Sequence, residues 1–291
     1  MGVRLKFNLV LLVVFAVGLG ATGYISHELL HRNARDEVLR AAGVMMEASL
    51  SMRHYTVANV RPLLVYDQDK FLPESVPAFA ATQVMAQLRK KYPDFSYKEA
   101  ALNPTNPRNR AADWETDILN VFRGDAAKNE ISGMRDTPTG RSLYLARPMR
   151  IKDEACLSCH TTAAMAPPAM VKLYGPNNGY GWKLDEVIAA QIVSVPMNLA
   201  IKNANNAFVT FISSIALVFA VLFIVLNVML TQLIVEPITQ LSEIADQISK
   251  GKANVAELPA QGRDEVAQLG QAFNRMRRSL EKAISLIDTK S

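Results

Sequence analysis

The run FNLVLLVVFAVGLGATGYIS, at residues 7–26, contains no charged side chain. Its length matches the roughly 20 apolar residues that an α-helix needs to cross the hydrocarbon core of a bilayer. A second uncharged run covers residues 203–235 and is most apolar at 208–234. A buried core helix is the alternative for each run, but uninterrupted apolar stretches of this length favour membrane spans. The two runs therefore divide the chain into two membrane spans, one segment between the spans and one segment after the second span.

Arg4 and Lys6 precede the first run, and the positive-inside rule then places the N-terminus in the cytoplasm. The same pattern begins a cleaved signal peptide, but we expect the segment to be kept as an anchor. The predicted division is a cytoplasmic N-terminus and first span at 1–27, an outside domain at 28–203, a second span at 204–235 and a cytoplasmic segment at 236–291. Both termini are then cytoplasmic, and the lipid membrane is the first predicted partner.

The only two cysteines, Cys156 and Cys159, are separated by two residues, and His160 follows directly. Two thiols at this spacing can add to the two vinyl groups of one haem, and the histidine can then bind its iron. A thioredoxin-like redox pair does not require the histidine, and disulfide frameworks use more cysteines in smaller chains. The pattern predicts one covalent haem c with His160 as axial ligand. Such haem is attached outside the bacterial cytoplasm, in agreement with the predicted topology.

The segment between the two spans shows the pattern of helices around a small sheet. Helical periodicity and strand-type alternation both occur in it. The expected helices lie at 28–66, 76–91 and 111–122, and the expected strands at 141–148 and 189–196. A long helix rising from the membrane into such a module is typical of an α+β, PAS-like sensor domain.

The cytoplasmic segment contains two short heptad patterns. Pro237 stands at the membrane exit, and the second pattern begins at the pair Asp264-Glu265, followed by Leu269 and Phe273. Two heptad helices joined by a connector favour a parallel four-helix bundle formed by a homodimer. An ordinary amphipathic hairpin does not explain the proline or the acidic pair. The segment looks like a HAMP domain, a module that relays movements of membrane helices.

Several short stretches occur in one order along nearly the whole outside segment. They are Arg53-x-Tyr55-Thr56, Arg61-Pro62, ALNPTNP at 101–107, Trp114-Glu115, Ala146-Arg147-Pro148, the pentapeptide from Cys156 to His160, and Tyr174-Gly175 with Gly179-x-Gly181-Trp182. Together they resemble a bacterial family of haem-c, PAS-like periplasmic domains. The resemblance implies a PAS-like fold, one covalent haem and a sensing role ahead of signalling modules.

The sixth iron ligand is left open by the sequence. A related cyanobacterial member of the family has a thiolate there, but both cysteines of this chain are predicted to hold the haem. His54 offers an imidazole, whereas Met45 and Met52 share a different helix face at seven-residue spacing. Core packing explains the methionines equally well. The alternatives are therefore His54, the Met45 and Met52 face, or a vacant or water-bound position that would let NO, CO or O₂ bind.

Other side chains are candidates for holding the haem. Arg53, Arg61 and Arg147 are candidate partners of the propionates, because guanidinium binds carboxylate with a two-pronged fork. Ion pairs within the fold are the alternative role. The candidates for a wall of the haem site, or for plain core packing, are Tyr144, Tyr174 and Trp182.

His27 and His31 lie one helical turn apart at the edge of the first apolar run. A pair of this spacing can bind a metal ion, and the more common role is that of polar side chains at the membrane interface.

Charge and composition narrow the function. The net charge of +5 is spread along the chain without the basic stripe that nucleic-acid binding requires. No acid-base or nucleophilic group of residues accompanies the haem, so we do not expect an enzyme. We expect a redox or diatomic-gas sensor in the bacterial inner membrane, with its haem domain in the periplasm, that signals through HAMP to a separate cytoplasmic protein. The alternatives are a membrane-anchored monohaem electron carrier with a periplasmic or membrane redox partner, or an accessory subunit of a membrane complex.

Overall fold

The computed structural model describes residues 2–64, 72–250, 257 and 262–288, with side chains to residue 282. The chain forms two compact units. The sheet unit comprises His27–Ala207, and the helical unit comprises Met1–Ser26 with Phe208–Ser291. The domain boundaries expected from the sequence stay predictions.

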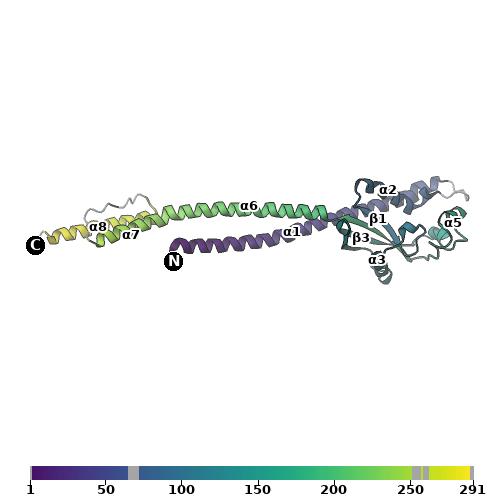
Figure 1. Cartoon of the computed structure of the whole chain (residues 1–291), viewed down its shortest axis with the longest axis horizontal. Coiled ribbons are helices and arrows are strands. Elements are labelled where there is room, and N and C mark those ends of the chain that lie inside the picture. Colours follow the sequence, from purple (N-terminus) through teal and green to yellow (C-terminus); the bar gives the residue numbers. More distant parts are fainter. Residues whose placement is uncertain (1, 65–71, 251–256, 258–261, 289–291) are drawn as a thin grey trace. The chain divides into compact units, whose positions relative to one another are not determined.

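The sheet unit is built on a sheet of four antiparallel strands in the order β1-β4-β3-β2 (Figure 1). The strands are β1 (Ser96–Ala101), β2 (Ile131–Thr137), β3 (Gly140–Arg150) and β4 (Val187–Pro196). The combination of helices and an antiparallel sheet confirms the predicted fold class. β3 and β4 contain the two predicted strands. β1 and β2 escaped prediction because charged residues and glycine interrupt their apolar alternation.

One face of the sheet is covered by α1 (Val3–Tyr55). Its buried side chains recur every four residues at Ala34, Val38, Ala42 and Met46, so a narrow stripe faces the sheet. Two of the four are alanines, which let the helix backbone approach the strands closely. The stripe packs against apolar residues of β3, β4 and the residue that follows, namely Leu143, Leu145, Val193, Val195 and Met197.

The regular α-helix ends before the first proline of this region. A π-helical turn (Thr56–Val60) and a 3₁₀ turn (Arg61–Leu63) follow Tyr55. Pro62 has no N–H to donate, so a regular helical hydrogen bond is lost there. The helix expected at 28–66 is confirmed in its main part, and residues 65 and 66 lie outside the described residues.

The opposite face of the sheet is covered by α3 (Asp113–Gly124), drawn below the sheet in Figure 1. Ile118, Leu119 and Phe122 are buried against small residues of the strands such as Ala146 and Ala190. A third helix of the unit, α2 (Pro77–Lys91), contacts β1. α2 and α3 agree with the helices predicted at 76–91 and 111–122.

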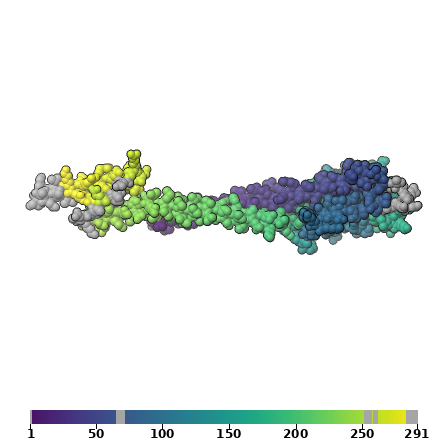
Figure 2. Space-filling model, turned by 90° about the horizontal axis from the view of Figure 1, so that it is seen from above, coloured from purple at the N-terminus to yellow at the C-terminus, as the bar shows by residue number. Residues whose placement is uncertain are grey.

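The helical unit contains the apolar runs. The helices that begin at Val3 and Asn198 are long and apolar enough to cross a membrane, as predicted. The first is the N-terminal part of α1, and the second is α6 (Asn198–Leu230). Phe15 and Phe219 stack with ring centroids 4.5 Å apart, and Figure 2 shows α1 in purple alongside α6 in green.

Two further helices follow α6 in this unit. After a π-helical turn (Thr231–Val235) come α7 (Glu236–Ser249) and α8 (Glu265–Asp288), which contact each other. Pro237 lies in the first turn of α7, where its missing N–H costs nothing. Asp264 accepts a hydrogen bond from the backbone N–H of Ala267 at 2.7 Å and so caps α8.

Candidate functional site

The predicted attachment cysteines lie in the connection between β3 and β4. A 3₁₀ turn, Glu154–Cys156, is followed at once by a short helix, Leu157–His160. Asp153 starts this segment, because its carboxylate accepts a hydrogen bond from a backbone N–H two residues later, at 2.9 Å. Cys156 and Cys159 are free, half-buried thiols at a three-residue spacing, which places them on one side of a helical turn. The local fold therefore presents both sulfur atoms to one neighbouring group.

The imidazole of His160 is fixed from two sides. Its Nδ1 lies 2.7 Å from the backbone carbonyl oxygen of Gly179, to which an Nδ1–H donates. The ring stacks on the indole of Trp182, with 3.7 Å between centroids and 8° between planes. Burial lowers the pKa of His160 and favours the neutral imidazole, although the Gly179 carbonyl acts in the opposite direction. With Nδ1 engaged, Nε2 is the nitrogen that keeps a lone pair for a metal.

The position of Gly179 requires a glycine. Its φ of 85° lies in the left-handed region, and an added Cβ would overlap Thr105. The backbone N–H of Trp182 donates to the carbonyl of His160 at 3.2 Å. Gly179 and Trp182, from the segment between α5 (Pro168–Tyr174) and β4, therefore orient His160.

Cys156 packs at the edge of the sheet. Burial raises the pKa of its thiol and Asp153 adds to this, whereas the guanidinium groups of Arg61 and Arg53 lower it. Both arginines therefore lie near the thiol. The apolar cluster that Cys156 joins consists of Ala101, Met149, Ile151, Leu157, Trp182, Ile188 and Ala189.

A hollow of about 280 Å³ opens where α1 meets β3 and β4. We call it the basic hollow because four of its nine lining residues are cationic. Arg147 in its wall donates to the carboxylates of Glu47 on α1 and Glu130, the latter at 2.9 Å. Cationic side chains from two or more elements therefore converge on one space, as binding of carboxylate groups requires. The lining residues are Leu50, Arg53, Asn129, Arg147, Pro148, Met149, Arg150, Lys152 and Gln191.

A buried polar chain holds Arg53 in this wall. Arg53 donates to Glu99 at 2.6 Å, and the Tyr97 hydroxyl donates to the same carboxylate oxygen at 2.7 Å. Gln191 donates to the Tyr97 oxygen at 3.1 Å, and both Glu99 and Gln191 are only 4% exposed. Burial, followed by the charge of Glu99, raises the pKa of Tyr97 far above its usual range, so the hydroxyl keeps its proton. Arg53 is thus fixed by side chains of β1 and β4.

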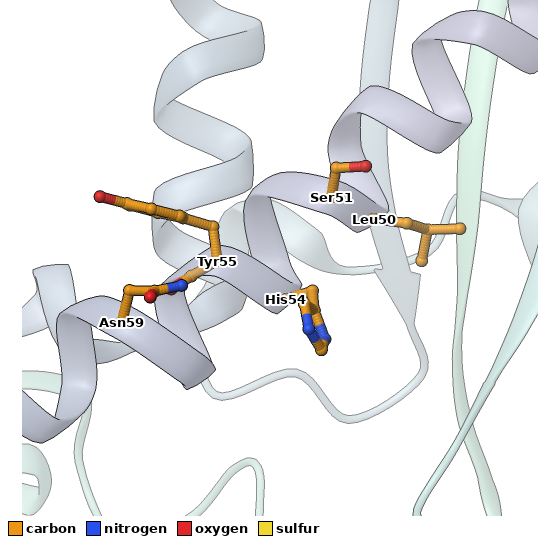
Figure 3. A pocket seen from close by; sticks show the side chains of 5 residues that line it. All are labelled: Leu50, Ser51, His54, Tyr55 and Asn59. Atoms are coloured by element: carbon orange, nitrogen blue, oxygen red, sulfur yellow. The ribbon is translucent and has the colours of Figure 1, made fainter.

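A second hollow, of about 360 Å³, lies along the same end of α1 (Figure 3). It is lined by Leu50, Ser51, His54, Tyr55 and Asn59. In Figure 3 the exposed His54 ring points to the opposite side of the helix from the Tyr55 ring. Leu50 lines both hollows, and His54 lies one turn after it. The imidazole therefore lines the second hollow, which shares Leu50 with the basic hollow.

The methionine candidates point elsewhere. Met45 packs against the apolar cluster between α1 and the sheet, and Met52 is half-buried. His54 lies about 200° further round the helix than Met52, since each residue turns the helix by about 100°. The side chains of His54 and Met52 therefore leave α1 in different directions.

The remaining predicted residues are distributed over both faces of the sheet. Tyr144 lies on the α3 face, where its ring is 5.6 Å from that of Trp114, so the structure does not bring it to the other candidates. Tyr174 ends α5 (Pro168–Tyr174) and is half-buried. Trp182 contacts His160 directly. The sequence reasoning missed the lining residues Met149, Arg150, Lys152 and Gln191 and the support from Gly179.

Comparisons with family models match two parts of the chain. A model of the Tll0287-like family matches residues 31–196, and a model of the HAMP domain matches residues 229–282. Among solved structures, the chain is similar to the cyanobacterial heme-protein Tll0287, with 15% identity over 55% of this chain and 95% of that chain, and a TM-score of 0.44. No curated protein matches the chain.

Proposed function

Because the chain belongs to the Tll0287-like family and carries a HAMP domain, we propose that it is a membrane-bound haem sensor. One haem c is attached through Cys156 and Cys159, and His160 is its axial ligand. The observation that carries this proposal is the orientation of His160, whose Nδ1 is held by Gly179 while Nε2 is left to bind iron. A haem-type domain joined to HAMP points to signalling rather than catalysis.

The residues present fit a haem. Two half-buried thiols share one side of a turn, a neutral imidazole follows them, and the basic hollow offers partners for anionic propionates. When bound, the haem would supply an iron that changes its redox state and binds diatomic gases. Arg53 and Arg147 line the basic hollow and Arg61 lies near Cys156, so these arginines bind the propionates and orient the haem.

His54 is the sixth ligand that the geometry supports best. It lines the second hollow, which shares Leu50 with the basic hollow, whereas Met45 packs against the core under α1 and Met52 shares the face of Met45. His54 is exposed, so its side chain has room to swing toward or away from the iron. A ligand that NO or CO can displace, or that responds to the iron's charge, would make the domain a gas or redox sensor.

The signal leaves the site along continuous backbone. His54 and Arg53 lie at the end of α1, which runs without a break back to Val3. β4 contributes Gln191 to the basic hollow and is followed directly by α6. A movement at the haem would therefore act on both candidate membrane helices, and α6 is followed by the HAMP helices.

The proposal includes a membrane topology with two spans. The protein crosses the bacterial inner membrane twice, with the haem domain at 28–203 in the periplasm, spans at 1–27 and 204–235, and the HAMP segment at 236–291 in the cytoplasm. Arg4 and Lys6 support this orientation. HAMP helices act as dimeric bundles, so the protein is a homodimer that signals to a separate cytoplasmic protein.

Absorption and EPR spectra of the full chain, oxidised and reduced, with and without CO and NO, test the sensor. They are paired with cross-linking of a Met276→Cys variant by a redox-neutral bis-maleimide, because Met276 lies on α8 and is exposed. We expect a spectral response to reduction or gas and a change of at least about twofold in the cross-linking rate. If CO and NO do not change the haem spectrum and the cross-linking rate does not depend on redox state, the sensor proposal is contradicted and the electron carrier is favoured.

A further inference from the structure

Two histidines of α1 form a pair away from the haem site. His27 and His31 are one helical turn apart, and their ring centroids are 4.3 Å apart with the planes tilted by 33°. Residues at this spacing share one face of a helix. Two imidazoles on one face are the donor set with which a single helix chelates a metal ion, as in the His-Glu-x-x-His motif of zinc sites. The spacing alone is compatible with plain polar side chains, so a further observation is needed.

A third donor comes from another helix. The side-chain oxygen of Asn205, on α6, lies 2.9 Å from Nε2 of His31. Two ligands that sit about 2.0–2.2 Å from one ion and at right angles to each other are about 3 Å apart. Without an ion the two atoms form a hydrogen bond. Once the ring proton has moved to Nδ1, the same separation lets both atoms bind one square-planar or octahedral ion as neighbouring ligands. All three residues belong to the sheet unit, His27–Ala207.

The donor set indicates the class of ion. Imidazole nitrogen with a neutral oxygen in a right-angled arrangement suits Cu²⁺ or Ni²⁺ better than tetrahedral Zn²⁺, and Cu²⁺ binds most tightly in the divalent series. The described residues hold no cluster of three His, Cys, Asp or Glu side chains, so water would complete the coordination. His27 and Asn205 are exposed, which gives an ion access from solvent.

We propose that His27, His31 and Asn205 form a binding site for a divalent transition-metal ion, with Cu²⁺ preferred. The site is separate from the haem motif and does not depend on the proposed sensing function. An ion held there joins α1 to α6 at the end of the first apolar run and the start of the second. It would therefore oppose sliding of one helix along the other.

The test is calorimetric titration of the detergent-solubilised full chain, prepared without a polyhistidine tag, with Cu²⁺ and Zn²⁺. We expect one Cu²⁺ per chain, bound more tightly than Zn²⁺. Loss of a residue that only orients a metal ligand costs about 10–100-fold in affinity, so loss of a ligand in His31→Ala or His27→Ala should weaken binding at least tenfold. The Cu²⁺ EPR signal should show coupling to two nitrogens in the natural chain and to one in His27→Ala. Unchanged affinity and coupling in both variants would overturn the site.

A matched pair of variants tests the role of the α6 residue. Asn205→Asp replaces the neutral oxygen with a carboxylate and should tighten Cu²⁺ binding about tenfold, whereas Asn203→Asp adds the same charge at an exposed position two residues earlier. Equal tightening in both variants would show attraction by charge alone and contradict coordination by Asn205. Because neither variant touches the haem motif, failure of this site leaves the haem proposal standing, and the reverse also holds.

Discussion

The two faces of the sheet are covered in different ways. On the α3 face, Ile118, Leu119 and Phe122 close an apolar core over the alanines of the strands. On the α1 face, the buried stripe of the helix is apolar from Ala34 to Met46 and becomes polar at Ser49. One turn later, Arg53 donates a hydrogen bond to the buried carboxylate of Glu99. The basic hollow lies at this polar end, and Cys156 packs in the same apolar cluster as Met149, one of the residues that line the hollow.

This difference distinguishes the face that serves for packing from the face that carries the candidate site. Burying charges is costly even when they are paired, and an apolar replacement is often as stable. The α3 face has the ion pair of Lys98 with Glu115, at 2.6 Å, at the start of a helix, where Glu115 also accepts a backbone N–H. The α1 face instead has a hydrogen-bonded chain of buried Gln191, half-buried Tyr97 and buried Glu99 that ends on Arg53. Such an arrangement indicates a site that needs a fixed cation.

The largest effect is expected on the α3 face. Phe122→Ala removes a fully buried ring and should lower the free energy of unfolding by about 3–5 kcal/mol, with no change in the haem spectrum. Denaturant titration followed by the fluorescence of Trp114 and Trp182, both in the sheet unit, measures this. Val121→Ala, at an exposed neighbouring position, is the control, and its change in the free energy of unfolding should be near zero. A shifted haem spectrum in Phe122→Ala would mean that the two faces are not separate.

A smaller but more specific effect is expected from Glu99→Gln. The side chain keeps its shape but loses its charge, so Arg53 loses its counter-ion and unfolding becomes easier by about 1–3 kcal/mol. The unbalanced positive charge near the iron should also raise the haem reduction potential, which spectroelectrochemistry measures. Glu115→Gln, the counterpart on the α3 face, should lower stability without moving the potential. Equal shifts of potential in both variants would contradict the assignment of the α1 face as the site.

Tyr97→Phe tests the same polar chain through pH. Because burial raises the pKa of Tyr97, the folded protein keeps a proton that the unfolded chain releases above its ordinary pKa of about 10. Stability from this hydroxyl is therefore complete below pH 10 and declines as pH rises further. The variant should be less stable by about 1 kcal/mol at neutral pH and should lack this alkaline loss. The exposed Tyr92→Phe serves as control, and an alkaline loss retained in Tyr97→Phe would refute the argument.

The smallest effect is expected at a surface pair. Arg141 and Asp136 lie opposite each other on β3 and β2, 3.4 Å apart, with side chains 54% and 83% exposed. Solvent screens this pair, so Asp136→Ala should change the free energy of unfolding by about 0.5 kcal/mol or less. The same titration measures it. A loss as large as that of Glu99→Gln would show that burial does not distinguish the two pairs.

Much of this fold could be predicted from hydropathy and local pattern. Local hydrophobic periodicity predicts the two apolar runs, the helices α2 and α3, and the strands β3 and β4. β1 was missed because its charged residues, half-buried Lys98 and buried Glu99, are accommodated only through partners on α3 and α1 that are distant in sequence. Tertiary context overrides strand propensity at such positions.

The site was predictable in its chemistry but not in its support. The spacing of Cys156, Cys159 and His160 is local, whereas His160 and Gly179 are 19 positions apart in the sequence, and no pattern predicts their contact. One signal was available and unused. Tyr144 and Arg147 are three residues apart on a strand, and alternation places residues at odd separations on opposite faces. That spacing alone predicts that the Tyr144 ring lies on the face of the sheet opposite to the basic hollow, which Arg147 lines.

The central claim is that one haem is held covalently by Cys156 and Cys159. The most direct test extracts non-covalent haem from the denatured protein with acidified organic solvent and records the pyridine haemochrome spectrum of what remains. The natural chain and the control Ser158→Ala, which alters the exposed residue between the cysteines, should both retain one c-type haem per chain. The double variant Cys156→Ala with Cys159→Ala should retain none. Haem that is fully extracted from the natural chain, or retained by the double variant, would contradict the account.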